Sequence, residues 1–516
     1  MKTGAYTWTL VVIILCASSV SATATKICLQ SKISNKKIYG ELLSFTGRQW
    51  EIATDFGRMK LTTEDAFPCE GPIPEPPGTV SQGDELRLAG SNTVGAALVP
   101  SLAVQLLKRD GSNPIVDRTS DAYTIIVKDE RRTLRIEAKG SSTGFQALKT
   151  GGAEIAMSSR PIDDTEVAAI AKVRKRGMQD PGREIVLALD AVVPIVAASS
   201  KLEAITLDQL RRIFSGSLVN WSTLGLGNAP ITVHARDDES GTFDTFYSLV
   251  LEPYGAVLSS KARRYTSNDE LAAEVSKNSN AIGFIAAGAL SKAGPRVRGL
   301  ALKGDCGIIQ NPNTFNIKTE DYALGRRLFL YSIDKDRTGL AREFVDFAVS
   351  DAAQPYIVDA GFISQEITAL DGNNYRRRLS EIAATADEPR GVRLARELRN
   401  LLHNAERLSV TFRFQTDSAV LDNKALQDGT RLARYLQTNA ARRELILIGF
   451  ADSTGDFSYN EILSQQRAAQ AEALLRNNGI TARRITTIGM SEELPAFCNT
   501  TESGRARNRR VEVWLR

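Results

Sequence analysis

The sequence predicts a mixed α/β protein built from several folded units. Three observations support this prediction. The chain has 516 residues, more than one ordinary core at roughly 100–200 residues per domain. From Glu85 onward, short apolar strands alternate with Gly/Ser turns and helical stretches, which is typical of a mainly parallel sheet. A Pro-rich stretch at 71–83 and an Arg-rich stretch at 373–407 separate regions of different pattern.

The N-terminus has the features of a secretory signal peptide. Residues 8–16 form a short apolar run behind Lys2, and small residues follow up to Ala24. The run is shorter than the roughly 20 residues of a membrane-spanning helix, so we expect a cleaved signal over 1–24. A lipoprotein acylated at Cys16 is the weaker alternative. The mature chain is therefore expected to be exported.

Residues 25–70 predict a small β domain. Short alternating runs with glycines at the turns indicate strands. Cys28 and Cys69 bracket this segment, and export makes a disulfide between them plausible. Closing that loop would stabilise the fold by about 4 kcal/mol in the chain-entropy model. For Cys306 and Cys498, the sequence leaves open whether they pair or remain buried thiols.

The composition favours binding over catalysis. A net charge of +5 is small for this length, and a nucleic-acid binder usually presents a dense basic face. Two His and five Cys leave little material for a metal site. We therefore expect no nucleic-acid partner, no metal, no cofactor and no catalytic residues.

Three loops of the middle region share one chemistry. They are Gly90–Val94, Gly140–Gly144 and Arg236–Thr242, each expected between a strand and a helix. Hydroxyls and backbone amides at a helix N-terminus favour an anion, helped by the helix dipole. Ser and Thr also cap helices for structural reasons, so one such loop alone is weak evidence for a site.

Five motifs in this region resemble those of the phosphate-binding periplasmic proteins of ABC importers. They are AGSNTV (89–94), KGSSTG (139–144), AMSSRPI (156–162), LDQLRRIFSGSLVNW (207–221) and RDDESGT (236–242). The resemblance covers about residues 84–368 and implies a domain over 84–372 whose two α/β lobes close on a tetrahedral oxyanion. Carried over by position, the ligand would be held by Thr93, the Val94 backbone, Ser141, Ser159, Arg236, Ser240, the Gly241 backbone and Thr242. Asp238 would orient Arg236.

One departure from the family pattern concerns ligand choice. Many members carry an Asp where Ser159 stands, and that Asp accepts the proton of monohydrogen phosphate. A serine hydroxyl can accept a hydrogen bond but can also donate one. We therefore predict phosphate as the ligand, with sulfate or another oxyanion as the alternative.

The last two regions differ from the rest. Residues 373–407 hold eight Arg and are expected to form a charged, partly helical connector, solvated or presenting a basic patch to an acidic surface. Residues 408–516 resemble the OmpA-like peptidoglycan-binding domain, through IGFAD (448–452), YN (459–460), LSQQRA (463–468) and GRARNRRVE (504–512). The resemblance implies an α/β sandwich that binds the diaminopimelate of the stem peptide.

That ligand carries an amino group and a carboxylate at its free end. Asp452 can pair with the ammonium, and Arg467 can hold the carboxylate in bidentate fashion. Asn460 would support the loop or contact the peptide. An ordinary internal Asp–Arg ion pair is the structural alternative. Phe450-Ala451 replace a common His-Thr pair before the Asp.

Taken together, the sequence predicts a two-lobed periplasmic-binding-protein fold with an OmpA-like sandwich and a small N-terminal β unit. Its expected function is phosphate binding in the periplasm by a protein held non-covalently on peptidoglycan. Delivery to an ABC importer, sensing and storage remain open. The alternatives are an envelope scaffold whose middle domain binds a protein, and a phosphatase using the same pocket.

Overall fold

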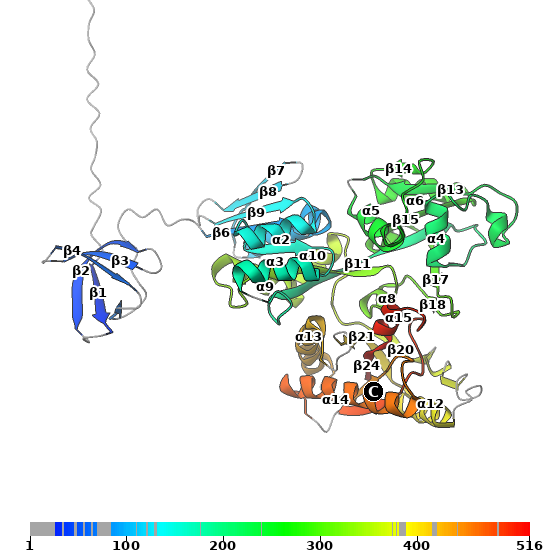
Figure 1. Cartoon of the computed structure of the whole chain (residues 1–516). Coiled ribbons are helices and arrows are strands. Elements are labelled where there is room, and N and C mark those ends of the chain that lie inside the picture. The colour runs from blue at the N-terminus through cyan, green and yellow to red at the C-terminus, as the bar shows by residue number, and fades with distance from the viewer. Residues whose placement is uncertain are drawn as a thin grey trace, which may run out of the picture. The chain divides into compact units, whose positions relative to one another are not determined.

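A computed structural model gives the fold of the chain (Figure 1). The structure describes residues 26–32, 36–45, 49–54, 57–62, 66–69, 84–109, 111–119, 122–127, 132–175, 177–238, 240–373, 375–377, 379–380, 389–414, 420–440, 442–481 and 485–516. The predicted signal (1–24) and the Pro-rich linker (71–83) lie outside these residues. The chain divides into two compact units, Met1–Gly83 and Asp84–Arg516.

The first unit contains an antiparallel sheet in the order β4-β3-β2-β1-β5. Its strands are β1 (Lys26–Ser31), β2 (Lys37–Phe45), β3 (Gln49–Thr54), β4 (Gly57–Thr62) and β5 (Ala66–Pro68). Leu29, Leu42 and Trp50 pack in a small core. The predicted Cys28–Cys69 disulfide is confirmed, with a Cα–Cα distance of 5.4 Å. It supplements a core that is thin for an independent domain.

The second unit begins with a middle domain of two lobes that share one long sheet, in the order β14-β13-β15-β11-β19-β10-β6-β9-β8-β7. Lobe 1 contains β6 (Glu85–Gly90), η1 (Val94–Leu98), α1 (Val99–Arg109), β7 (Ile115–Arg118), β8 (Ala122–Val127), β9 (Arg132–Ala138), α2 (Ser141–Thr150), β10 (Ile155–Ser158), α3 (Asp164–Arg174), α9 (Gly339–Ala348), η6 (Asp351–Ala353) and α10 (Gln354–Asp359). Its core gathers apolar side chains of α1, α9 and the strands.

Lobe 2 forms a second core around three aromatic side chains, Phe214, Phe246 and Phe284. It contains β12 (Ala204–Ile205), α4 (Leu207–Phe214), η2 (Trp221–Leu224), β13 (Thr232–Arg236), α5 (Gly241–Phe246), η3 (Tyr247–Leu251), η4 (Glu252–Tyr254), β14 (Arg263–Tyr265), α6 (Asn268–Ser276), β15 (Ala281–Ala286), η5 (Ala287–Ala289), α7 (Leu290–Ala293), β16 (Val297–Gly299), β17 (Ala301–Lys303), β18 (Ile309–Gln310) and α8 (Thr314–Lys318).

Two strands join the lobes. β11 (Glu184–Ala197) is 14 residues long and almost entirely buried. It pairs antiparallel with β19 (Gly325–Ser332) near lobe 1, and with β15 in lobe 2. β11 passes between the lobes in Figure 1, and β19 pairs with it, so any change in the angle between the lobes must bend these strands.

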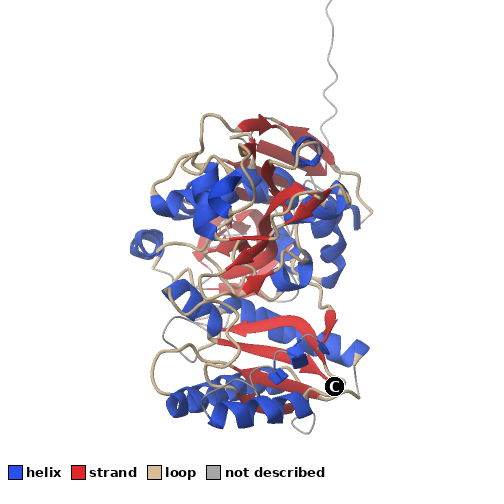
Figure 2. Cartoon of the chain, turned by 90° about the vertical axis from the view of Figure 1, so that its right-hand side faces the viewer, coloured by secondary structure: helices blue, strands red, loops and turns tan. Residues whose placement is uncertain are grey.

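The C-terminal domain is a five-stranded sheet in the order β20-β21-β24-β22-β23. Its elements are β20 (Ala369–Asp371), α12 (Pro389–Leu401), β21 (Glu406–Arg413), α13 (Asn423–Asn439), β22 (Leu445–Gly449), α14 (Phe457–Asn477), β23 (Ile485–Gly489), α15 (Glu502–Asn508) and β24 (Arg510–Leu515). Figure 2 shows helices covering the sheets of the molecule. The α/β prediction is confirmed.

The Arg-rich stretch differs from its predicted role as a solvated connector. Its helix α12 buries Leu394, Ala395 and Leu398, which pack with Ile446 and Trp514 of the sheet. The apolar positions at helical spacing therefore face the C-terminal core, while the arginines lie on the opposite side. Residues 381–388 of the same stretch lie outside the described residues.

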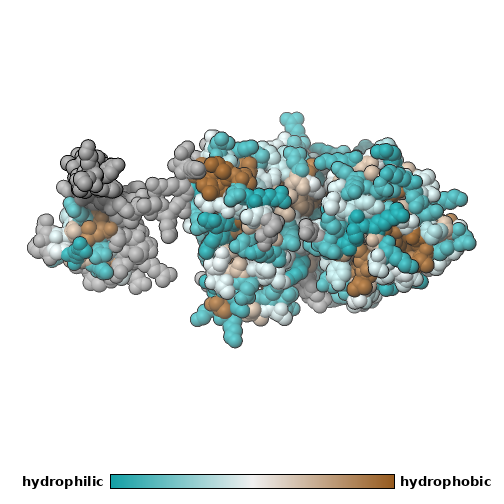
Figure 3. Space-filling view, turned by 90° about the horizontal axis from the view of Figure 1, so that it is seen from above, coloured by the Kyte–Doolittle hydropathy of each residue, from teal (hydrophilic) through white to brown (hydrophobic). Residues whose placement is uncertain are grey.

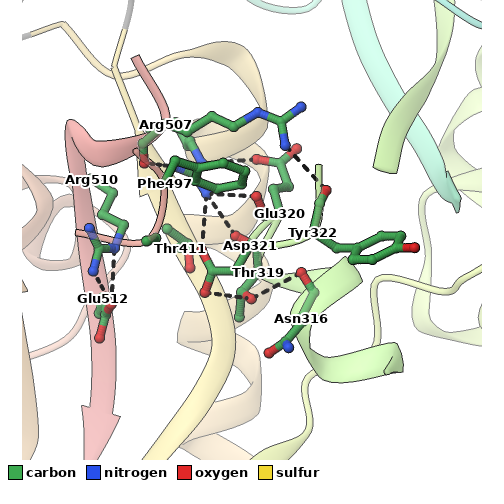
Figure 4. A network of polar contacts seen from close by, with 12 residues as sticks. Asn316, Thr319, Glu320, Asp321, Tyr322, Thr411, Phe497, Arg507, Arg510 and Glu512 are labelled. Atoms are coloured by element: carbon green, nitrogen blue, oxygen red, sulfur yellow. Dashed lines mark hydrogen bonds and ion pairs between the residues drawn. The ribbon is translucent and has the colours of Figure 1, made fainter. Parts of the chain in front are cut away.

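A buried ion-pair network joins the C-terminal domain to lobe 2 (Figure 4). Arg407 Nη2 lies 2.8 Å from Asp321 Oδ2, and Arg507 Nη1 donates to the Tyr322 carbonyl at 3.2 Å. Burial by itself would raise the pKa of Asp321, but the guanidiniums of Arg407 and Arg413 outweigh it and lower the pKa. The network is therefore held as paired charges.

Two further contacts extend this interface. A disulfide links Cys306 of lobe 2 to Cys498 of the C-terminal domain, which settles the pairing that the sequence left open. On lobe 1, Asn423 Nδ2 donates to the Gln179 carbonyl at 2.8 Å. Gln427 Oε1 accepts from the Val186 amide at 3.1 Å. The C-terminal domain thus contacts both lobes.

Among the described residues, no helix is both long enough and apolar enough to cross a bilayer. The face in Figure 3 is mainly hydrophilic, with apolar residues in separate patches.

Candidate functional site

Three strand ends of lobe 1 meet at one edge of the sheet. β6 pairs in parallel with both β9 and β10, so the carboxyl ends of these strands lie side by side. The Gly90 carbonyl accepts hydrogen bonds from the amides of Lys139 and Gly140, each at 2.8 Å. Gly90 has φ +141°, and a Cβ there would lie 2.0 Å from the Met157 carbonyl oxygen. Glycine is therefore required for this close approach.

This edge carries the four predicted ligand groups of lobe 1. Thr93 precedes the first turn of η1, which Val94 begins. The hydroxyls of Ser141 and Ser159 lie 3.5 Å apart, and the Ser159 amide donates to Ser141 Oγ at 3.2 Å. Unpaired amides at a helix start add donors for an anion. The predicted lobe 1 groups are thus gathered at one sheet edge.

Lobe 2 brings a helix start to the same place. Ser240 caps α5 and accepts from the amides of Thr242 and Phe243 at 3.2 and 3.4 Å. Gly241 lies against Thr93, and a Cβ on Gly241 would be 2.7 Å from Thr93 Oγ1. The two lobes therefore touch at this point.

A cavity of about 520 Å³ lies beside this contact. Five of the predicted residues line it: Thr93, Arg236, Ser240, Gly241 and Thr242. The charged side chains in its lining are Asp190, Arg236, Asp269, Lys292 and Asp359. Ser141 and Ser159 lie at the neighbouring sheet edge without lining the cavity, and the Val94 side chain is buried.

Arg236 is held by the strand and helix beside it. It donates to the carbonyls of Tyr265 at 3.2 Å and Thr266 at 2.8 Å, and to Asn268 Oδ1 at 3.0 Å. Burial lowers the pKa of its guanidinium below the ordinary value. The arginine remains charged because its ordinary pKa is so high.

The expected role of Asp238 is not what the structure shows. Asp238 Oδ1 lies 2.6 Å from Nη2 of Arg264, and this is its ion pair in the described part of the chain. Arg264 in turn donates to the Arg236 carbonyl. The two carbonyls and Asn268 therefore orient the Arg236 guanidinium, and Asp238 pairs with Arg264 of the neighbouring strand β14.

Two charged residues of the site were not predicted from the sequence. Arg326 of β19 pairs with Asp190 of β11 at 3.1 Å, and both are largely buried. Nη2 of Arg326 also donates to Thr93 Oγ1 at 3.0 Å and to the Gly241 carbonyl at 3.3 Å. Asp190 is a lone charge in the apolar middle of β11, which is the signal that could have revealed it. Arg326 stands next to Arg327 near the start of β19, so the sequence gives no such signal for it.

A second candidate site lies in the C-terminal domain. A cavity of about 610 Å³ is lined by Asp452, Asn460 and Arg467, the three residues expected to bind peptidoglycan. The other residues lining it are Ala451, Thr454, Tyr459, Leu463, Gln466, Glu502, Arg505 and Arg509. The three predicted side chains come from the end of β22 and from α14.

Asp452 is already paired inside the protein. Arg509 Nη1 donates to Asp452 Oδ2 at 2.8 Å, and the Thr454 amide donates to Oδ1 at 2.8 Å. Burial by itself would raise the pKa of Asp452, but these two hydrogen bonds outweigh it and lower the pKa. The carboxylate is therefore ionised, and Arg509 is a participant that sequence reasoning missed.

Arg467 is only partly satisfied. Its Nη1 donates to the Phe450 carbonyl at 3.1 Å, whereas its buried Nε has no hydrogen-bond partner in the described part of the chain. Asn460 Nδ2 donates to the Asp452 carbonyl at 3.1 Å and to Glu492 at 2.5 Å. Asn460 thus supports the loop that carries Asp452.

Comparison with known proteins identifies both domains. Residues 115–352 match the model of the PBP superfamily domain, and residues 413–509 match the OmpA family. The chain carries a PBP superfamily domain followed by an OmpA family domain. This confirms the fold and the two resemblances expected from the sequence.

The similar proteins include two curated relatives of the PBP domain. The phosphate-binding protein PstS of Staphylococcus saprophyticus is 26% identical over 288 residues, covering 54% of this chain and 84% of the relative. Protein SphX of Synechococcus elongatus is 27% identical over 275 residues, covering 51% of this chain and 76% of the relative.

Solved structures resemble each domain. An ABC-type phosphate transport receptor from Vibrio cholerae is 23% identical with a TM-score of 0.43, covering 54% of this chain and 99% of the receptor. A peptidoglycan-associated lipoprotein from Burkholderia pseudomallei is 24% identical with a TM-score of 0.20, covering 20% of this chain and 89% of the lipoprotein.

Proposed function

We propose that this protein binds phosphate between the lobes of its PBP domain and is held on peptidoglycan, in the periplasm, by its OmpA domain. The carrying observation is the cavity where Thr93 of lobe 1 meets Ser240, Gly241 and Thr242 of lobe 2 beside Arg236. Hydroxyls, helix-start amides and one guanidinium are the donors that a tetrahedral oxyanion requires.

The ligand would be held in the closed arrangement of the two lobes. Donors from both lobes face one cavity, so an anion between them is contacted on two sides, and each contact favours the closed arrangement. Ser141 and Ser159 would complete the lobe 1 side from the adjoining sheet edge. The similarity of this sequence to relatives named as phosphate-binding proteins supports phosphate as the ligand.

Calorimetric titration of the full chain with phosphate tests this assignment. Arg236→Ala should weaken binding by at least tenfold, because a charge-assisted hydrogen bond is worth about 1.5–3 kcal/mol. Arg342→Ala is the control, since Arg342 is an exposed residue of α9 outside the cavity. If no oxyanion binds, the PBP domain is better explained as a scaffold that binds a protein.

The OmpA cavity is proposed as the wall site. Asp452 would pair with the ammonium of diaminopimelate, and Arg509 would hold the Asp452 carboxylate in place. The guanidinium of Arg467, which lines this cavity, would donate to the ligand carboxylate. Co-sedimentation with purified peptidoglycan tests this, and the double variant Asp452→Ala, Arg467→Ala should remain in the supernatant. Equal pelleting of variant and parent would contradict the assignment.

Whether the bound phosphate serves an ABC importer, a sensor or a store is a further part of the proposal. A protein held on the wall has limited reach, which favours sensing or storage unless the importer lies close by. Crosslinking of the full chain in membranes, with and without phosphate, would detect an importer partner.

A further inference from the structure

A buried carboxylate lies at the wall of the oxyanion cavity. Asp190 of β11 is 5% exposed and lines the cavity together with Thr93 and Arg236. Its Oδ2 accepts from Arg326 Nε at 3.2 Å and from Thr245 Oγ1 at 3.3 Å. Its Oδ1 makes none of the hydrogen bonds found among the described residues, so one acceptor of this carboxylate is available to a ligand.

Arg326 ties this carboxylate to the ligand loops of both lobes. Its Nη2 donates to Thr93 Oγ1 and to the Gly241 carbonyl. Because the Thr93 oxygen accepts from Arg326, its hydroxyl proton points away from Arg326 and can be donated to another acceptor. Thr93 itself lines the cavity. The ion pair thus fixes Asp190 and Thr93 at the same place in the site.

The chemical consequence of such a carboxylate depends on the ligand's proton. A carboxylate facing an oxyanion repels it unless the oxyanion donates a hydrogen bond. At neutral pH monohydrogen phosphate and arsenate carry a proton, whereas sulfate and selenate carry none. Ser159 can donate or accept, so it does not discriminate between them.

We propose that Asp190 is the residue that makes this site selective for proton-bearing oxyanions. Its Oδ1 accepts a hydrogen bond from the protonated oxygen of phosphate or arsenate. Sulfate and selenate have no proton to donate, so Oδ1 faces them without a hydrogen bond. Asp190 lies on β11. Ser159, which follows β10, offers only a hydroxyl and cannot play this role. The proposal rests on the proposed phosphate site and names its ligand class.

The first test uses the full-length protein and pairs of anions matched in geometry. Calorimetry with arsenate and selenate, and with phosphate and sulfate, compares ligands that differ chiefly in their proton. The proton-bearing member of each pair should bind at least tenfold more tightly, because an unpaired buried acceptor is costly. Equal affinities would overturn this inference and leave the oxyanion site standing. Binding of none would instead refute the proposed function.

The second test locates the effect at Asp190. Asp190→Asn should reduce the ratio of the arsenate affinity to the selenate affinity at least tenfold, since an amide can donate to a proton-free anion. Asp346→Asn removes an exposed carboxylate of α9 outside the cavity lining and should leave the affinity ratio unchanged. If Asp190→Asn fails to fold because Arg326 loses its partner, the double variant Asp190→Asn, Arg326→Gln removes both buried charges and gives the readout. A folded variant with the parental ratio would overturn the inference.

Discussion

Gly241 lies where the two lobes touch, and its missing side chain makes the contact possible. A Cβ at this position would be 2.7 Å from Thr93 Oγ1, closer than real Cβ contacts allow. Gly241→Ala should therefore hold the lobes apart and weaken phosphate binding about tenfold, measured by calorimetry. Gly152→Ala is the matched control, since the nearest atom to its Cβ lies at an ordinary 3.6 Å. Unchanged affinity in Gly241→Ala would show that the ligand does not require this closure.

His234 gives the PBP domain a dependence on pH. It is buried, and its Nδ1 lies 2.9 Å from the Tyr265 hydroxyl. Burial, with a smaller effect of Arg263, lowers the pKa of His234 from 6.5 to about 4. Below pH 6.5 the unfolded chain takes up a proton that the folded state resists, so stability is lost as the pH falls toward 4.

Between pH 7 and pH 5, His234 is expected to lower the free energy of unfolding by about 2 kcal/mol. Urea unfolding at the two pH values measures it. His234→Gln should lose this part of the pH dependence, whereas His403→Gln, at the chain's other and exposed histidine, should keep it. Identical pH profiles in the parent and His234→Gln would contradict the assignment.

At the residue scale, sequence reasoning found the groups that carry a motif. Thr93 and the Ser240–Thr242 loop follow strands and start helices, a pattern that hydroxyl and glycine spacing reveals. Asp190 and Arg326 carry no such pattern, because each lies within a long buried strand whose pairing becomes known only in the fold. Arg509 was missed in the same way, since a terminal run of arginines does not say which one meets Asp452.

At the element scale, α12 shows that an arginine-rich segment can be part of a core. Leu398 is fully buried against the C-terminal sheet. Its helical spacing was visible in the sequence, but the surrounding arginines masked its role. Helical spacing shows that α12 has an apolar face, but which surface that face packs against is known only from the tertiary structure.

A substitution within α12 tests its place in the core. Leu398→Ala removes a fully buried side chain and should destabilise the C-terminal domain by about 2–5 kcal/mol, as measured by urea unfolding. Glu397→Ala, one residue earlier on the exposed side, should change stability by no more than about 0.5 kcal/mol. Equal effects of the two substitutions would mean that α12 is a solvated connector after all.

At the scale of the whole molecule, the OmpA domain is joined firmly to the PBP domain. The Cys306–Cys498 disulfide closes a loop of 192 residues. In the chain-entropy model, such a loop contributes up to about 5 kcal/mol. No local sequence signal could predict this pairing, because it requires two domains to meet.

The double variant Cys306→Ser, Cys498→Ser should therefore melt at a lower temperature than the parent, as measured by calorimetry. The variant Cys28→Ser, Cys69→Ser acts on the separate N-terminal unit and should leave that melting transition in place. If the Cys306–Cys498 variant melts like the parent, the buried ion pairs alone hold the interface.

The same interface should limit how far the lobes open. The OmpA domain holds lobe 1 through Asn423 and Gln427 and lobe 2 through Arg407, Arg507 and the disulfide, so opening must break one set of contacts. Spin labels at exposed Lys108 of lobe 1 and Lys261 of lobe 2 report the distance between lobes. Phosphate should change this distance little in the parent and more in Asn423→Ala, Gln427→Ala. Arg434→Ala removes only an exposed ion pair to Asp351 and should behave like the parent. A large change of equal size in all three proteins would show that the OmpA domain moves freely with one lobe and does not restrain the other.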